Sequence, residues 1–192
     1  MTDQRIEDLI KIWQERNVAG VYYGEKIQAV EKILELIPLS ASVGFSGSVT
    51  LDELGVIKKL EARGNKVFNP YKPGISREES LAIRKQAGGA DFYLASANAI
   101  SQTGELVFLS AYGNRTAGVA YARNVIVVCG VNKITENLEA AIKRSREYAT
   151  PLNIKRLNWD ANKIMRCQTL IIEAEVTPDR LKVILVGENL GF

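Results

Sequence analysis

The chain has 192 residues, 46% of them hydrophobic and 24% charged, and these are ordinary proportions for a globular protein with a substantial core. Its formal net charge of +3 is too small to predict binding to nucleic acid or to a membrane surface. The sequence contains no histidine and two cysteines, which excludes a Ser-His-Asp triad, a Cys-His pair, an HExxH zinc site and an all-cysteine tetrahedral metal site. We therefore predict no metal site, and any proton transfer must use Glu, Asp, Lys, Tyr or Cys.

Residues 1–192 are expected to form a single domain, in which an N-terminal helix packs on the core. No run approaches the roughly 18 uninterrupted apolar residues of a transmembrane helix, and the N-terminus lacks the apolar centre of a secretory signal. A cytoplasmic location is the resulting expectation. Cys129 lies inside an apolar run, which indicates a buried, unreactive thiol.

Helical and strand patterns alternate in the first half of the chain. Apolar residues at helical spacing predict helices at residues 3–17 and 25–37, and capping signals predict two more at residues 50–63 and 76–88. Short apolar runs predict strands at residues 18–23, 41–45, 66–68 and 91–95. Thr50 with Glu53, and Ser76 with Glu79, have the spacing of capping boxes, so the third and fourth helices are expected to begin there.

The second half begins with a predicted hairpin between residues 99–102 and 105–109, which turns at Thr103 and Gly104. A short helix or a turn is expected from residue 113 to Tyr121. Residues 125–129 form a nearly pure β-branched run, as in a strand buried on both faces.

The C-terminal part is harder to assign. Thr135 is expected to cap a helix that ends near Ala149, with Tyr148 facing inward and Pro151 as the break. Residues 153–166 have no clear pattern. Residues 168–174 and 181–186 are expected to form late strands, added to the main sheet in antiparallel orientation.

This alternation predicts an α/β fold with a mainly parallel sheet and late antiparallel strands. Ligands of such sheets bind beyond the carboxyl ends of the strands. Polar clusters follow predicted strands at residues 46–50, 98–102 and 132–133. A ligand site is therefore expected where these clusters meet, with most of its polar groups in residues 95–134.

The candidate ligand-binding residues are those with anion-binding or hydrogen-bonding groups at these strand ends: Ser46, Gly47, Ser48, Thr50, Asn98, Asn114, Arg115 and Asn132. Residues 46–50 place a small-residue loop before a helix, where free backbone N–H groups can bind an anion, although a simple tight turn would look the same. The planar fork of Arg115 suits a carboxylate or phosphate, or an internal salt bridge. The two asparagines Asn98 and Asn114 could bind a ligand or their own turns, and Tyr71 and Lys72 could reach a ligand from their loop.

The candidate catalytic residues are Glu105 and Lys133. Glu105 is the best candidate for an acid or base, and its alternative role is that of a solvated carboxylate at a strand end. Lys133 could neutralise an anion beyond a strand end, or simply lie near the next helix.

Taken together, several segments resemble the LUD domain, the lactate-utilisation family, and they occur in that family's order: residues 42–55, 71–79, 96–106, 113–115, 125–134 and 151–156. The resemblance covers nearly the whole chain. It implies a Rossmann-like three-layer sandwich of the kind shared by glucosamine-6-phosphate deaminase, ribose-5-phosphate isomerase and CoA transferases.

LUD proteins include a subunit of an iron–sulfur complex that oxidises L-lactate to pyruvate. The resemblance thus implies an accessory or substrate-binding subunit in the oxidation of lactate or a related 2-hydroxy acid, with a small anionic metabolite as ligand. Similar chains often carry several cysteines where this one has only Cys167, and an iron–sulfur cluster normally has four cysteine ligands. Any redox centre would then belong to an iron–sulfur partner protein, and no cofactor is assigned to this chain.

Alternatives stay open at this point. The chain could be a stand-alone enzyme on a phosphosugar or CoA-type substrate, with Glu105 as nucleophile if CoA-transferase-like chemistry is retained. It could also be a non-catalytic metabolite sensor. A second copy of the chain, forming a homodimer, is a further candidate partner.

Overall fold

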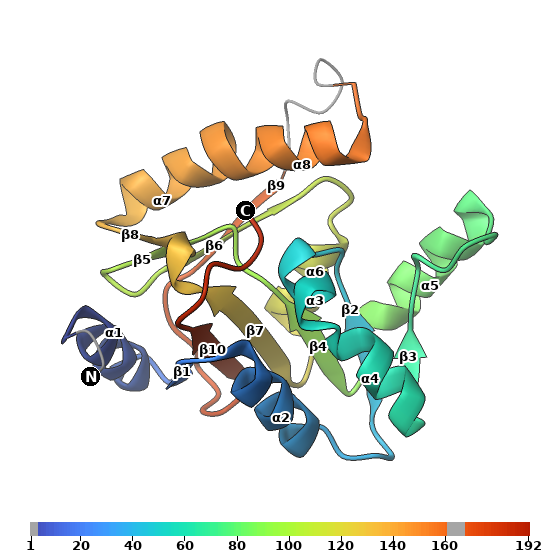
Figure 1. The fold of residues 1–192 in the computed structure, drawn as a ribbon, viewed down its shortest axis with the longest axis horizontal. Coiled ribbons are helices and arrows are strands. Elements are labelled where there is room, and N and C mark those ends of the chain that lie inside the picture. The colour runs from blue at the N-terminus through green and yellow to red at the C-terminus, as the bar shows by residue number, and fades with distance from the viewer. Residues whose placement is uncertain (1–3, 161–167) are drawn as a thin grey trace.

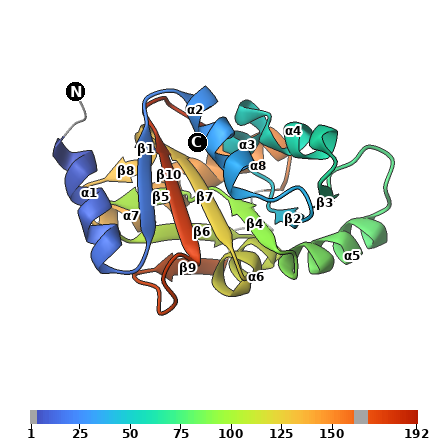
Figure 2. The same ribbon diagram turned by 90° about the horizontal axis from the view of Figure 1, so that it is seen from below.

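A six-stranded parallel sheet forms the centre of the molecule in the computed structural model, which describes residues 4–160 and 168–192. Its strands lie in the order β1 (Ala19–Tyr23), β10 (Leu181–Val186), β7 (Val125–Gly130), β4 (Phe92–Ala95), β2 (Ser42–Phe45) and β3 (Lys66–Phe68). Figure 2 shows β1, β10, β7 and β4 side by side, with the N-terminal helix outside β1. The predicted α/β class with a mainly parallel sheet is confirmed.

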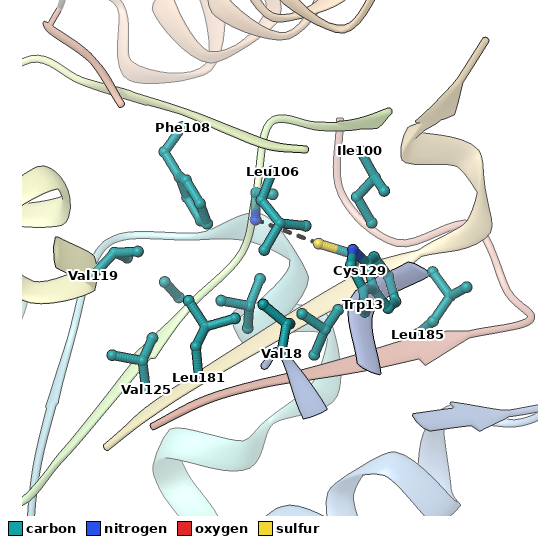
Figure 3. Packing of buried hydrophobic residues seen from close by; sticks show 14 of the residues in the cluster. Trp13, Val18, Ile100, Leu106, Phe108, Val119, Val125, Cys129, Leu181 and Leu185 are labelled. Atoms are coloured by element: carbon teal, nitrogen blue, oxygen red, sulfur yellow. Dashed lines mark hydrogen bonds between the residues drawn. The ribbon is translucent and has the colours of Figure 1, made fainter. Parts of the chain in front are cut away.

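Both faces of this sheet are covered. On one face lie α2 (Lys26–Leu36), α3 (Val49–Leu54) and α4 (Val56–Arg63), and on the other lie α1 (Gln4–Glu15), α5 (Arg77–Gly88) and α6 (Asn114–Tyr121). Strand β7 contributes Val125, Val127 and Cys129 to one core and Ile126 and Val128 to the other. The prediction that this strand is buried on both faces is therefore confirmed, and Figure 3 shows Cys129 packed within the first of these cores.

A second sheet stacks on the face that α1 and α6 cover. Its order is β8 (Ile134–Thr135), β5 (Ala99–Ser101), β6 (Leu106–Ser110) and β9 (Gln168–Ile172). Strands β5 and β6 form the predicted antiparallel hairpin. Helices α7 (Leu138–Arg144) and α8 (Thr150–Leu157) lie across its outer face (Figure 1). There Ala141 of α7 packs on Ala99 and Val107.

The late strands divide between the two sheets. Strand β9 is antiparallel to β6, but it extends the second sheet and not the main one. Strand β10 runs parallel between β1 and β7, so the antiparallel orientation expected for it is wrong. Its side chains enter both cores in alternation, and a strand buried on both faces is stabilised most at the centre of a sheet.

Pro151 does not end the helix that precedes it. A π-helical turn at Ser145–Ala149 links α7 to α8, and Pro151 lies at the start of α8, where its missing N–H is tolerated. Thr150 Oγ1 donates a hydrogen bond to the carbonyl oxygen of Ser145 at 2.8 Å, which satisfies an acceptor in the widened turn. Tyr148, expected to face inward, is 53% exposed.

Of the helix starts predicted at Thr50, Ser76 and Thr135, the structure confirms the one at Ser76. The Ser76–Glu79 capping box is confirmed. Thr50 instead lies inside α3, which Ser48 caps, and Gly55 with φ 62° separates α3 from α4. Helix α7 is capped by Asn137, because Thr135 belongs to β8.

Helix α1 packs on the core as expected, through Ile6, Leu9 and Trp13. Residues 161–167, and with them Cys167, lie outside the described residues. Within the described ranges, no helix has the length and apolar character that crossing a membrane requires.

Candidate functional site

Two adjoining pockets open beyond the carboxyl ends of β2, β4 and β7. The large pocket has a volume of about 680 Å³, and the small pocket has a volume of about 50 Å³. Both are lined by Gly47, Ser48, Asn98, Arg115 and Asn153. The location is the one predicted from the polar clusters at the strand ends.

Lys133 lies against the small pocket, in the single 3₁₀ turn that follows β7. It is 4% exposed, and its Nζ donates hydrogen bonds to Ser96 Oγ at 2.8 Å, Thr50 Oγ1 at 2.9 Å and the carbonyl oxygen of Ala97 at 3.1 Å. Burial lowers the pKa of Lys133 to about 8, and the positive charge of Arg115 acts in the same direction. No carboxylate among the described residues forms an ion pair with it.

Arg115, in the first turn of α6, ties together the segments around the pockets. Its Nε donates to Ser46 Oγ at 3.2 Å, and its Nη2 donates to the carbonyl oxygen of Gly47 at 2.6 Å. Its Nη1 donates to Asn98 Oδ1 at 3.0 Å and to the carbonyl oxygen of Leu109 at 2.9 Å. Arg115 therefore positions three strand ends, while its charge makes the potential between them more positive.

The loop predicted to bind an anion is itself held by hydrogen bonds. Ser48 Oγ accepts from the backbone N–H of Leu51 at 3.3 Å, and the backbone N–H of Gly47 donates to the hydroxyl of Tyr71 at 2.6 Å. A Cβ at Gly47 would lie 2.8 Å from that hydroxyl oxygen, so the close approach requires glycine. The loop thus lines both pockets with a fixed backbone.

The three candidate asparagines have different surroundings. Asn98 lines both pockets, and Asn114 lines the large one. Asn132 lines neither. Its Oδ1 accepts from the backbone N–H of Leu190 at 3.1 Å, and its Nδ2 donates to the carbonyl oxygen of Gly191 at 3.3 Å.

Glu105 lies at the turn of the β5–β6 hairpin and lines neither pocket. Its carboxylate accepts hydrogen bonds from Arg16 Nη1 at 3.2 Å and from Thr103 Oγ1 at 2.6 Å. Burial would raise the pKa of Glu105, but the hydrogen bonds from Thr103, Ser101 and Arg16 outweigh it, and this pKa lies below its usual value. The structure therefore does not bring Glu105 together with Lys133.

The large pocket has an aromatic wall of which only Tyr71 was a candidate in the sequence. Arg84 Cζ lies 5.2 Å from the ring centroid of Tyr71 and 4.8 Å from that of Tyr112. Trp159 meets Tyr112 edge-to-face, with ring centroids 5.8 Å apart. No local pattern marked Arg84, because its helix is mostly polar. Ser96 was also missed, although it directly follows β4 as Ser46 directly follows β2.

Across residues 4–160 and 168–192, no three carboxylate or thiol groups come together in a cluster that could hold a metal ion.

The fold and the site define a class: an α/β protein with lysine- and arginine-containing pockets at the carboxyl ends of its parallel strands. Within that class, the chain belongs to the LUD domain family, whose family model matches residues 6–186. The predicted membership is confirmed. No curated protein matches the chain.

Solved structures provide a further comparison. A DUF162 family protein from Deinococcus radiodurans is similar over 96% of this chain and 95% of its own, with a TM-score of 0.55 and 14% identity. Ribose 5-phosphate isomerase A from Neisseria gonorrhoeae gives a TM-score of 0.42 at 14% identity, over 85% of this chain and 92% of its own. The eIF2B beta subunit from Chaetomium thermophilum gives 0.34 at 16% identity, over 93% of this chain and 49% of its own. At such identities, the likeness to the first structure concerns the fold alone.

Proposed function

We propose that this LUD domain binds a small anionic metabolite, with a carboxylate or phosphate of that metabolite next to Lys133. In this proposal it serves as an accessory or substrate-binding subunit in the oxidation of lactate or a related 2-hydroxy acid. The observation that carries the proposal is Lys133 itself, a buried lysine with two arginines near it and no carboxylate partner among the described residues.

The energetic cost of burying the Lys133 ammonium group supports this proposal. A buried ammonium group is unfavourable unless an opposite charge offsets its lost hydration. At pH 7 a lysine with a pKa of about 8 is still mostly protonated, so the folded protein carries that cost when the pocket holds no anion. An anion beside Nζ would offset it, and the hydroxyl groups of Ser96 and Thr50 could turn to donate to the same anion.

The redox chemistry of lactate oxidation would have to come from elsewhere. Cys129 is buried in the core and the only other cysteine is Cys167, whereas an iron–sulfur cluster normally has four cysteine ligands. We therefore propose an iron–sulfur protein as the partner. Isolating the tagged chain from its native cells, and then assaying L-lactate oxidation with and without the chain, tests this role. Equal oxidation without the chain would rule it out.

The binding step has a separate test. Thermal-shift titration with L-lactate, pyruvate and ribose 5-phosphate should stabilise the native protein in proportion to saturation. Lys133→Met should abolish the shift of every ligand that binds at this pocket. Lys66→Met, at an exposed lysine that lines neither pocket, should leave the shift unchanged. Equal shifts in Lys133→Met and the native protein would refute the proposal.

A stand-alone enzyme is the second candidate, and the lowered pKa of Lys133 favours it. A pKa of about 8 leaves part of the amine neutral near pH 7, and such an amine can accept a proton. Ser96 Oγ lies 2.8 Å from it. A turnover screen with phosphosugars and CoA thioesters, comparing Lys133→Met with the native protein, tests this. Binding of a metabolite without turnover would instead favour a sensor.

A further inference from the structure

Arg84 is the starting point, because its surroundings differ from those of the other cations at the large pocket. It lies in α5 and lines that pocket, where its guanidinium group contacts the rings of Tyr71 and Tyr112. Its Nε is buried and has no hydrogen-bond partner among the described residues. A buried donor without an acceptor is costly, so the described residues leave part of the hydrogen-bonding capacity of this guanidinium group unused.

Three other cations at this pocket, Lys58, Lys72 and Arg156, have carboxylates near them. Lys72 Nζ lies 3.9 Å from Glu61 Oε1. Burial raises the pKa of the Asp52 carboxyl group, and the positive charges of Arg156 and Lys58 oppose that rise, which places both cations near Asp52. For Arg84, in contrast, the described residues provide two aromatic faces and no ion pair.

We propose that Arg84 binds a second anionic group of the ligand whose first anionic group lies next to Lys133. The ligand class is then a metabolite with two separate carboxylate or phosphate groups, one for each pocket. This inference rests on the proposed function, because it assigns the first group to Lys133.

The geometry of the wall suits this role. A guanidinium group presents parallel N–H groups that match the two oxygens of a carboxylate or phosphate. Contact with two tyrosine rings limits the rotation of Arg84, so little conformational freedom is lost when the anion binds. A volume of about 680 Å³ is also typical of sites for ligands considerably larger than lactate.

The experiment compares probes with one and with two anionic groups. Affinities for L-lactate, L-malate, citrate and 3-phosphoglycerate are measured by calorimetry on the full chain and on three variants: Lys133→Met, Arg84→Gln and Lys66→Gln. Lys66 is the matched control, because its Nζ lies 5.1 Å from the Phe68 ring centroid and it lines neither pocket. Urea denaturation checks that each variant is folded.

We expect at least one probe with two anionic groups to bind about tenfold or more tightly than L-lactate. Arg84→Gln should remove that advantage while lowering L-lactate affinity far less, and Lys133→Met should weaken the binding of both kinds of probe. Lys66→Gln should change neither. If no dianionic or trianionic probe binds more tightly than L-lactate, or if Arg84→Gln binds all of them like the native protein, the inference is wrong. If only Lys133→Met binds the probes more weakly than the native protein, the proposed function stands and this inference fails. If Lys133→Met binds them as tightly as the native protein, the proposed function is refuted.

Discussion

Lys133 and Glu105 were both candidate catalytic groups, yet the structure gives them opposite surroundings. Glu105 has a cationic partner, Arg16, and hydroxyl donors around it. Lys133 is more deeply buried, near Arg115 and Arg144, and hydroxyl and carbonyl oxygens are its only hydrogen-bond acceptors among the described residues. We therefore expect the Glu105–Arg16 pair to affect the stability of the fold. We propose that the charge of Lys133, which has no anionic partner among the described residues, is offset by a bound ligand.

The contrast extends to the elements that hold each residue. Around Glu105, Trp13 Nε1 donates to the carbonyl oxygen of Gly104 at 2.8 Å, and α1 is thereby fixed on the hairpin turn. Around Lys133, Arg115 binds backbone and side-chain oxygens of separate strand ends. The first region is expected to affect folding alone, and the second both folding and binding.

The largest effect is expected from Trp13→Ala. Trp13 is fully buried, and its truncation should reduce the free energy of unfolding by about 3 to 5 kcal/mol, as measured by urea denaturation. The folded fraction should keep its affinity for the anionic probes, because Trp13 lines neither pocket. Leu39→Ala, at a side chain that is 60% exposed, is the control and should cost about 0.5 kcal/mol or less. A loss of affinity in folded Trp13→Ala would show that the region around Glu105 also affects ligand binding.

The second largest effect is expected from Arg115→Lys. A lysine keeps the charge but cannot reproduce the fork that reaches Ser46, Gly47 and Asn98, so we expect a loss of about 2 to 3 kcal/mol in stability. Affinity should fall together with stability, because the loop that lines both pockets loses its anchor. Stability loss with unchanged affinity in calorimetry would show that the pocket forms without this anchor.

Local patterns predicted the parts of the fold that local interactions determine. The alternating elements, the β5–β6 hairpin, the Ser76 cap and the two-sided burial of β7 all follow from periodicity or short-range hydrogen bonds. The strand-end position of the pockets followed from the parallel sheet.

Most of what could not be predicted depends on contacts between distant segments. The apolar run of residues 181–186 suits a strand buried on both faces, but it does not specify β1 and β7 as the neighbours of β10 or the parallel orientation. One missed feature is local: the helix continues past Pro151, where the hydroxyl groups of Ser145 and Thr150 donate hydrogen bonds within the widened turn. The position of Glu105 away from Lys133 depends on α1 lying against the hairpin.

The pH dependence of stability tests whether Lys133 carries a buried charge. The folded pKa of about 8 lies below the ordinary value of 10.5, so between these values the unfolded chain binds more protons and stability rises with pH. Below pH 8, Lys133 is protonated in both the folded and the unfolded state, so the cost of burying its charge is fully present. Between these two pH values, we expect the free energy of unfolding of the native protein to rise by about 1 to 3 kcal/mol more than that of Lys133→Met, as measured by urea denaturation. Parallel profiles for the two proteins would mean that Lys133 does not carry a buried charge.

The smallest effect is expected from Glu105→Gln, and it decides between the two roles considered for this residue. The amide keeps the shape but loses the charge that faces Arg16, so we expect a stability loss of about 1 kcal/mol or less at pH 7. Since the folded pKa of Glu105 is lowered, this difference should be present at neutral pH and disappear as the pH falls through that pKa. Affinity for the anionic probes should not change, because Glu105 lines neither pocket. If a turnover screen finds an activity that Glu105→Gln abolishes in the folded protein, the catalytic role predicted from the sequence is right, and pairing with Arg16 then serves to hold a reactive carboxylate.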